Sequence, residues 1–189
     1  MLATLDLSTV RRLADSFAHD GWRMVHSNSF IKDDSNGRIS SDWSTTKDLD
    51  GIGGVYAILL PVVWFSPRRI LHLHAPHTYQ GDGIPFEFSL PDFTGDGYGI
   101  VYVGRTSNLR QRWRGHFSRG ERKDGGQVKF GMVDCGVAAD CDTALRELRQ
   151  HARIIYTVLE GSEHCANRDI LELSLCARFA PPFNIKSEH

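Results

Sequence analysis

The 189-residue sequence contains no apolar run near the roughly 20 residues that a transmembrane helix needs. Its four cysteines (Cys135, Cys141, Cys165 and Cys176) include no Cys-x-x-Cys pair, which argues against a zinc ribbon and, in a chain of this length, against a disulfide framework. The first residues lack the apolar core of a signal peptide, and internal repeats are absent. These absences favour a soluble cytoplasmic protein whose thiols are reduced and mostly buried.

The sequence also lacks a large net charge of either sign, since its formal net charge is only −1. The charge is nevertheless unevenly distributed, because residues 105–129 hold eight basic and two acidic side chains, a local balance of 8 − 2 = +6. The basic residues are Arg105, Arg110, Arg112, Arg114, Arg119, Arg122, Lys123 and Lys129. Such a block is typical of a surface that binds a polyanion, although a solvated helix face would have the same composition.

Hydrophobic periodicity and capping residues predict a mixture of helices and short strands. We expect helices over residues 8–19, 108–120, 142–153 and 167–180, with Asn108 and Asp142 as N-caps of the second and third. We expect strands over residues 55–60, 70–75, 84–90, 100–104, 128–136 and 154–160, with a turn at 80–83 and loops at 32–50 and 91–99. The sum is an α+β fold with a small antiparallel sheet covered by helices.

Five groups of residues that could carry chemistry follow one another along these elements. In chain order they are Gly54-Val55-Tyr56 on one strand, Tyr102-Val103-Gly104 on a later strand, Arg112 and His116 on one helix face, Glu172 on the last helix and Asn184 beyond Pro181-Pro182. Each group alone is weak evidence for a catalytic role, because a strand tyrosine is usually a core residue and a helix arginine is usually a surface residue. Glu172 is more informative because it lies among leucines, and a carboxylate there needs a partner.

In this order and spacing, the groups resemble the motifs of the GIY-YIG nuclease family. The first two motifs stand here as Gly-Val-Tyr and Tyr-Val-Gly, with valine for the family's isoleucine, and the resemblance runs over residues 51–184. It implies a mainly antiparallel three-stranded sheet flanked by helices, and a Mg²⁺-dependent endonuclease (Mn²⁺ is an alternative) that cuts double-stranded DNA. It implies the catalytic residues Tyr56, Tyr102, Arg112, His116, Glu172 and the structural Asn184, with Glu172 as metal ligand. The basic block would supply DNA contacts from Arg105, Arg110, Arg114, Arg119 and Lys123.

The residue types suit the hydrolysis of a phosphodiester, which needs an attacking water and neutralisation of charge on the phosphate. A single carboxylate, Glu172, can hold Mg²⁺ because that ion keeps much of its water shell. Arg112 can donate two parallel hydrogen bonds to a phosphate, and it does not lose its charge. Tyr56 could orient the water, or deprotonate it if nearby cations and the metal lower its pKa from about 10. Tyr102 and His116 would assist at the water or phosphate, and Gly104 would permit a tight turn after its strand.

Two departures from the family pattern bear on the biological role. Tyr56 and Tyr102 lie 102 − 56 = 46 residues apart, so residues 61–99 form an insertion in the nuclease-like region 51–189, and an extra helix lies near residues 142–153. We hypothesise that the insertion contacts DNA or a second subunit, and that deleting residues 67–97 leaves the core folded. Residues 1–50 would be an N-terminal extension.

No helix-turn-helix, zinc finger or helicase segment accompanies the motifs. This favours a single-domain type II restriction enzyme that acts as a homodimer and has a companion DNA methyltransferase. The alternatives are a nuclease of branched, damaged or mobile-element DNA, and a nucleic-acid-binding module without catalysis. A zinc site around His72, His74 and His77, completed by His164 or Cys165, is a further hypothesis.

Overall fold

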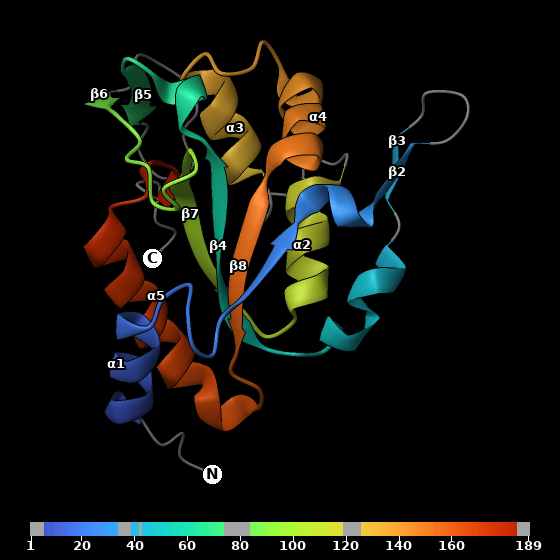
Figure 1. Cartoon of the computed structure of the whole chain (residues 1–189), viewed down its shortest axis with the longest axis vertical. Helices are drawn as coiled ribbons and strands as arrows, with labels where there is room; N and C mark the ends of the chain where they lie inside the picture. The colour runs from blue at the N-terminus through green and yellow to red at the C-terminus, as the bar shows by residue number, and fades with distance from the viewer. Residues whose placement is uncertain (1–5, 34–38, 42, 74–83, 119–125, 185–189) are drawn as a thin grey trace.

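A four-stranded antiparallel sheet forms the centre of the protein in the computed structural model (Figure 1), which describes residues 6–33, 39–41, 43–73, 84–118 and 126–184. Its strands are β1 (Arg23–His26), β8 (Arg153–Val158), β4 (Gly54–Pro61) and β7 (Tyr98–Thr106), in that spatial order. The predicted α+β class is therefore confirmed, and the predicted three strands are wrong by one. The missed strand, β1, is short and mostly exposed, so it lacks the alternation that marks a half-buried strand.

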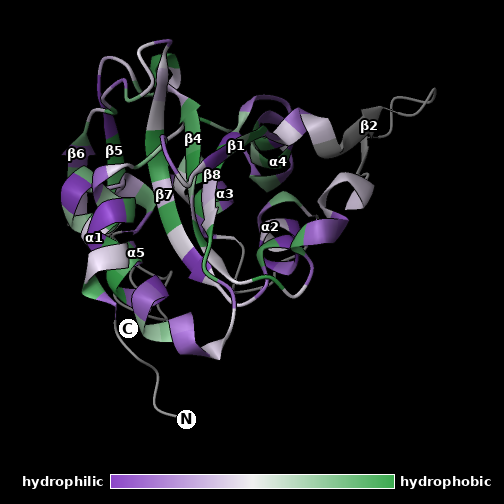
Figure 2. Ribbon diagram, turned by 60° about the horizontal axis from the view of Figure 1, so that its bottom comes forward, coloured by the Kyte–Doolittle hydropathy of each residue, from purple (hydrophilic) through white to green (hydrophobic). Residues whose placement is uncertain are grey.

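Helices cover both faces of this sheet, as Figure 1 shows. α1 (Leu7–Asp15) and α5 (Cys165–Phe179) pack against Val55, Ala57 and Leu59 of β4. On the opposite face, α2 (Leu109–Phe117), α3 (Gln127–Asp134) and α4 (Cys141–His151) cover alternate residues of the same strand. β4 is thus buried on both sides, which explains its continuous apolar sequence, and Figure 2 shows the hydrophobic strands between more hydrophilic helices.

Three boundaries differ from the predictions. α1 ends at Asp15, earlier than expected, and Ala18 beyond it has a positive φ of 68°. The expected loop at residues 32–50 contains β2 (Ile31–Asp33) paired with β3 (Ile39–Ser41), followed by η2 (Trp43–Leu49). α4 has Asp140 as its N-cap instead of Asp142, because the Asp140 carboxylate accepts the Thr143 N–H.

α3 replaces the strand expected over residues 128–136. Its valines and phenylalanine favour a strand locally, but Val128, Gly131 and Met132 have the i, i+3, i+4 spacing of a helix face and are buried. Gly131 is needed there because a Cβ would lie 2.4 Å from the ring of Phe183. Tertiary packing against the C-terminal segment therefore decides the conformation.

The insertion leaves the sheet at the end of β4 that is remote from Tyr56. Its η3 (Val62–Phe65) leads to a two-stranded sheet of β5 (Arg69–Leu73) and β6 (Ile84–Phe88), as predicted, and the expected turn at 80–83 lies outside the described residues. Pro61, where the insertion starts, is five residues along β4 from Tyr56, or about 17 Å at a strand rise of ~3.3 Å.

The insertion is also part of the hydrophobic core. Leu71, Phe88 and Leu90 are 2%, 8% and 5% exposed and pack in the same cluster as Tyr56. Deleting residues 67–97 would remove these three core side chains, so we now expect the deletion to destabilise the core.

Candidate active site

Four of the expected catalytic side chains meet in one hydrogen-bonded cluster between the sheet and α2. Tyr56 on β4 and Tyr102 on β7 belong to the sheet face that α2 covers, and α2 contributes Arg112 and His116. The Tyr56 hydroxyl lies 2.8 Å from His116 Nε2. Arg112 donates from Nε to Tyr56 Oη and from Nη2 to Tyr102 Oη, both at 3.1 Å. We call these four residues the tyrosine–histidine cluster.

The direction of the two arginine bonds follows from the guanidinium, which can only donate, so both tyrosine oxygens accept. The direction of the Tyr56–His116 hydrogen bond depends on the imidazole tautomer: the hydroxyl donates when Nε2 is unprotonated and accepts when Nε2 carries the proton. In either case the Tyr56 hydroxyl lies directly beside a buried imidazole.

Burial dominates the ionisation of the tyrosines. Burial raises the pKa of Tyr56 well above 10, and Tyr102 adds to the increase, while Arg112 opposes it. Burial also raises the pKa of Tyr102, with a further increase from the negative charge of Glu172. Burial acts to lower the pKa of Arg112, but the two tyrosines outweigh it and the pKa is raised. Both tyrosines are thus protonated at neutral pH, and the arginine is charged. Arg112 acts to lower the pKa of Tyr56, but burial outweighs it, so this cation alone does not bring the pKa below its ordinary value.

Gly104 allows the two tyrosines to approach β7 closely. A Cβ at this position would lie 2.7 Å from Tyr102 Cε1 and 2.8 Å from Tyr56 Oη. Gly104 pairs with Tyr56 inside β7, which continues to Thr106, so the expected tight turn at Gly104 is absent. The glycine is required by the packing of the cluster rather than by backbone conformation.

Both ends of α2 are held by specific contacts that orient Arg112 and His116. At the N-terminus, the Asn108 side chain accepts the Gln111 N–H, as predicted for the N-cap. At the C-terminus, the buried cations Arg149 and Lys129 donate to the carbonyls of Phe117 and Ser118, each at 2.9 Å. Cations are favourable at this end because of the helix dipole. Lys129, counted in the basic block, is therefore a helix-capping residue.

Asn184 pairs with the edge strand β7 instead of with the reacting groups. Its side chain accepts the Val103 N–H at 2.7 Å and donates to the Val103 carbonyl at 2.6 Å. The amide thus forms the two hydrogen bonds that a neighbouring strand would form. Val103 lies between Tyr102 and Gly104, so Asn184 fixes the part of β7 that carries the second motif.

Glu172 lies on α5 and is paired with Arg105. Because Arg105 is opposite Val55 in the β4–β7 register, it belongs to the sheet face that α5 covers. Its Nε lies 3.0 Å from Glu172 Oε2 and 2.9 Å from Asp169 Oδ1. Glu172 thus connects α5 to β7 through Arg105, and its negative charge also reaches Tyr102, whose pKa it helps to raise.

The acidic pair on α5 fits a hard divalent cation. Asp169 and Glu172 are three residues apart, so they share a helix face, and a guanidinium cation already stands between them. Asp169 Oδ1 is buried and accepts no hydrogen bond within the described residues, so only charge joins it to Arg105. No group of three or more His, Cys, Asp or Glu side chains that could hold a metal occurs in the described part of the chain. Water and substrate would therefore supply most ligands, as Mg²⁺ prefers.

Asp169 was not among the residues expected from the sequence. The i, i+3 spacing of Asp169 and Glu172 was visible in the sequence and could have identified it.

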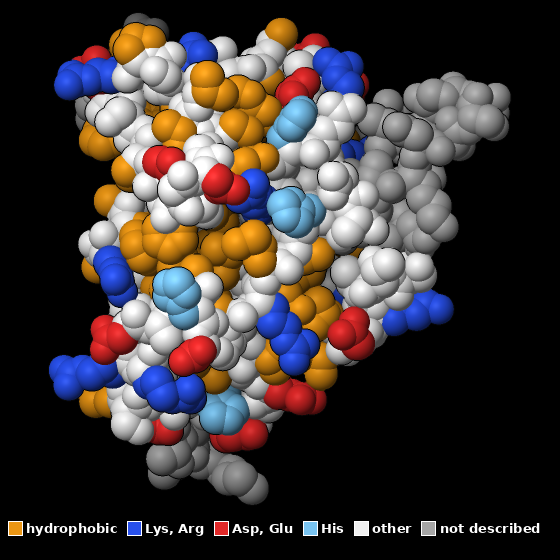
Figure 3. All heavy atoms as spheres, viewed as in Figure 1, with side chains coloured by type: hydrophobic (Ala, Val, Ile, Leu, Met, Phe, Trp, Pro, Cys, Tyr) orange, Lys and Arg blue, Asp and Glu red, His pale blue; other side chains and the backbone are white. Residues whose placement is uncertain are grey.

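Three of the five expected DNA-binding residues lie in the described part of the chain, and two of these are paired with carboxylates. Arg105 is paired with the α5 carboxylates, and Arg110 lies 3.0 Å from the Asp50 carboxylate. Arg114 is exposed, and Arg119 and Lys123 lie outside the described residues. The face in Figure 3 accordingly mixes basic and acidic side chains. The described residues of the basic block are distributed over β7, α2 and α3.

The other metal hypothesis and the cysteines can be placed in part. His72 is paired with Asp134, and His74 and His77 lie outside the described residues. All four cysteines are free thiols, but Cys141 and Cys165 are exposed, so the expectation of mostly buried thiols is wrong.

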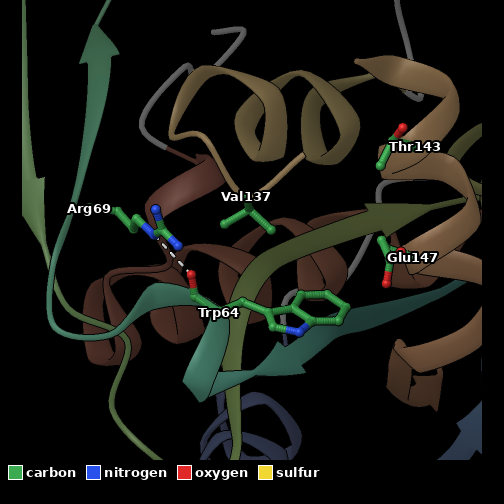
Figure 4. Close-up of a pocket in the computed structure, with 5 residues that line it drawn as sticks. All are labelled: Trp64, Arg69, Val137, Thr143 and Glu147. Carbon is green, nitrogen blue, oxygen red and sulfur yellow. Dashed lines mark hydrogen bonds between the residues drawn. The ribbon is translucent and has the colours of Figure 1, made fainter. Parts of the chain in front are cut away.

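A separate pocket of about 150 Å³ lies between the insertion and α4 (Figure 4). Its lining residues are Trp64, Arg69, Val137, Thr143 and Glu147, none of which was expected in the active site. Arg69 donates from Nε to the Trp64 carbonyl at 2.9 Å, which ties the start of β5 to η3. The pocket thus marks where the insertion adjoins the helical layer.

Comparisons with protein families, curated proteins and solved structures find no match to this chain. Among the described residues, no helix is long and apolar enough to cross a membrane.

Proposed function

We propose that this protein is a divalent-metal-dependent endonuclease of the GIY-YIG type that hydrolyses phosphodiester bonds in double-stranded DNA. The observation that carries the proposal is the tyrosine–histidine cluster, in which residues 10, 56 and 60 positions apart are joined by direct hydrogen bonds. A binding module needs positive charge but no buried tyrosine–imidazole pair. The pair is useful where a proton has to move.

In the proposed reaction, Tyr56 contacts the attacking water. As the water oxygen approaches phosphorus, the Tyr56 oxygen accepts its proton, and the Tyr56 hydroxyl proton passes 2.8 Å to His116 Nε2. Tyrosinate does not accumulate, which agrees with the raised pKa of Tyr56. The imidazole holds the proton as imidazolium while the ester bond breaks.

Arg112 places a permanent positive charge beside both hydroxyl groups, where it would stabilise the phosphoryl oxygens. Tyr102 fixes the far side of the guanidinium and would hydrogen-bond the phosphate. When Mg²⁺ or Mn²⁺ is bound, with Glu172 as its ligand, it would supply Lewis-acid stabilisation of the developing charge. Asn184 would act only by positioning β7.

The form we favour is a sequence-specific type II restriction enzyme that works as a homodimer on DNA, with a DNA methyltransferase as its companion. Two copies of one active site would be needed to cut both strands of a symmetric site. The insertion supplies the surface by which copies or DNA could be contacted, because its Val63, Ile70 and Phe86 are large apolar side chains exposed by 74%, 50% and 40%.

The test is incubation of the protein with plasmid and genomic DNA, with Mg²⁺ or with EDTA. Wild type should produce discrete fragments only with Mg²⁺, and Glu172→Ala and Tyr56→Phe should lose at least about a hundredfold in rate. Tyr156→Phe is the matched control, since Tyr156 pairs with Tyr56 across the β4–β8 ladder and is also buried, and its variant should cleave normally.

Each other result has a defined meaning. Cleavage confined to branched or damaged DNA would replace restriction with a structure-specific role. Binding of DNA without cleavage of linear, branched or single-stranded substrates, by protein shown to be folded, would refute the endonuclease and leave a binding module.

A further inference from the structure

The pocket between the insertion and α4 combines an aromatic wall with opposite charges at its two ends (Figure 4). Trp64 of η3 and Val137, which follows α3, supply its apolar surface. Arg69 of β5 lies at one end and Glu147 of α4 at the other. The pocket has a volume of about 150 Å³, and a cavity of about that volume holds one benzene-sized ring. Its size and its aromatic wall therefore suit a ligand with a single flat ring.

The Trp64 indole is held in place before any ligand arrives. Its backbone carbonyl accepts Arg69 Nε at 2.9 Å, and its ring meets the His151 imidazole edge-on, with centroids 5.4 Å apart and planes at 86°. The side chain is only partly buried and packs against the hydrophobic core. A fixed aromatic face of this kind can stack a planar ring with little loss of side-chain entropy.

The two charged side chains retain donors and acceptors for a ligand. Arg69 uses Nε to bond the Trp64 carbonyl, and its two Nη groups form no hydrogen bond or ion pair with the residues that the structure describes. The Glu147 side chain is 30% exposed, and its charged neighbours His151 and Arg146 lie 3.7 and 3.9 Å away, beyond hydrogen-bond distance. One end of the pocket therefore donates hydrogen bonds and the other end accepts them.

This polarity distinguishes between nucleobases. Cytosine is a single six-membered ring with an amino group that donates and a ring carbonyl that accepts, so Glu147 would accept from the amino group and Arg69 would donate to the carbonyl. Uracil and thymine have a carbonyl in place of the amino group, and that oxygen would face the Glu147 carboxylate with no proton between them. Purines add a second ring, which exceeds the volume of the pocket.

We propose that this pocket binds one unpaired cytosine base, stacked on Trp64 between Arg69 and Glu147. The proposal goes beyond the endonuclease activity, because it concerns binding at the insertion and includes no step of hydrolysis. The base has to be unpaired, because in a duplex its ring is stacked on both faces and its amino group and carbonyl are paired with guanine. A cytosine nucleoside and a cytosine in a single strand present the same chemistry.

Isothermal titration of the protein with deoxycytidine and with deoxyuridine tests the proposal. Wild type should bind deoxycytidine at least about tenfold more tightly, because only its amino group can donate to the Glu147 carboxylate. Glu147→Gln should abolish this preference, since an amide can accept from the amino group of one base or donate to the carbonyl of the other. A purely structural role of Glu147 would weaken the binding of both nucleosides without changing the ratio of their affinities.

Two further variants examine the aromatic wall and the choice of glutamate. Trp64→Leu should weaken the binding of both nucleosides by about tenfold, because base stacking is lost. Glu160→Gln is the matched control, since Glu160 is exposed on the segment after β8, and this variant should keep the wild-type preference. Thermal unfolding shows whether each variant is folded. If Trp64→Leu is unfolded, the affinity ratio of Glu147→Gln decides, because Glu147 is partly exposed and outside the core.

Short single strands of cytosine or thymine deoxynucleotides identify the source of the base. Binding of the cytosine strand at least as tightly as deoxycytidine supports a site for nucleic acid, and binding of the nucleoside alone supports a small-molecule site; the cytosine pocket stands in both cases. Equal affinity of wild type for deoxycytidine and deoxyuridine, tighter binding of deoxyguanosine, or no saturable binding would overturn it. DNA cleavage without deoxycytidine binding would leave the proposed function intact, and deoxycytidine binding without cleavage would leave the pocket intact.

Discussion

Replacing Gly104 with alanine tests whether the tyrosine–histidine cluster is packed as tightly as its geometry indicates. The added methyl would lie 2.7 Å from Tyr102 Cε1, 2.8 Å from Tyr56 Oη and 2.9 Å from Tyr56 Cζ. These are ring atoms of two side chains whose hydroxyls are already held by Arg112, so neither ring can rotate away freely. The strand must shift, or the hydroxyls must leave their partners.

The expected loss of stability follows from two opposing effects. Overpacking a buried site costs about 1–3 kcal/mol, and a strained hydrogen bond adds about 1 kcal/mol. Alanine also lowers the conformational entropy of the unfolded chain, which offsets about 0.4–1 kcal/mol of this destabilisation. We expect a net destabilisation of about 2 kcal/mol, which is a decrease in Tm of about 4–8 °C for a domain of this size. DNA cleavage should fall further, by about a hundredfold, because a shift near 1 Å disturbs the path from Tyr56 to His116.

Differential scanning calorimetry and the plasmid assay measure the two effects, and Gly51→Ala provides the comparison. Gly51 has φ +76° and no atom within 4 Å of an added Cβ, so its variant should lose about 1 kcal/mol through backbone strain and retain full activity. In Gly104→Ala/Tyr56→Phe the nearest hydroxyl is absent, so the stability loss should be smaller than the sum of the single losses. Wild-type stability together with wild-type cleavage in Gly104→Ala would refute the reasoning.

Three further predictions concern residues that support the cluster. Asn184→Ala should lower the free energy of unfolding by about 2–3 kcal/mol, because both backbone groups of Val103 lose their hydrogen-bond partner. Urea titration measures this loss, and a value below about 0.5 kcal/mol would contradict the strand-mimicking role of Asn184. The pKa values of Tyr56 and Tyr102 are raised in the folded state, so the stability that the two tyrosines contribute is complete below pH ~10 and is lost as the pH rises above it. Absorbance at 295 nm should show these two tyrosines ionising only as the protein unfolds. Titration of both near pH ~10 in folded protein would refute this expectation. Arg149→Met should reduce stability by about 1–2 kcal/mol and slow cleavage, because the C-terminus of α2 loses a charged donor; unchanged kinetics would show that the helix end does not position the cluster.

Where a segment's local pattern and its tertiary surroundings agree, the sequence was a sufficient guide to the fold. The central strands β4, β7 and β8 were predicted from apolar runs that are buried on the sheet, and α2 and α5 from helical spacing. α3 was mispredicted because packing of Gly131 against Phe183, far away in sequence, overrides its strand propensity. β1 was missed because a mostly exposed strand at the edge of a sheet has no apolar alternation.

In the candidate site, too, some contacts could be predicted from local sequence pattern and others could not. The motif order indicated Tyr56, Tyr102, Arg112 and His116, and these residues do meet. The partnership of Arg105 with Asp169 and Glu172 was not predicted, since the arginine was grouped by its neighbours in a basic block. Which charge a side chain meets depends on the sheet face to which it points, and this follows from register rather than from composition.

The register of β7 therefore determines which side chains reach the tyrosine–histidine cluster and which reach the α5 carboxylates. Tyr102 and Arg105 are three residues apart, so they point to opposite faces of a regular strand, one toward α2 and the other toward α5. The register shift between Ile58 and Leu59 of β4, opposite the start of this segment, and the Asn184 amide on Val103 bracket Tyr102 from two sides. A slip of β7 by one residue would turn Tyr102 away from Arg112, so its hydroxyl would lose the Arg112 guanidinium. The same slip would bring Arg105 to the tyrosine face and leave the α5 carboxylates without that cation. The edge strand thus joins the tyrosine–histidine cluster on one face to the acidic pair on the other, and Asn184 holds the segment between them through Val103.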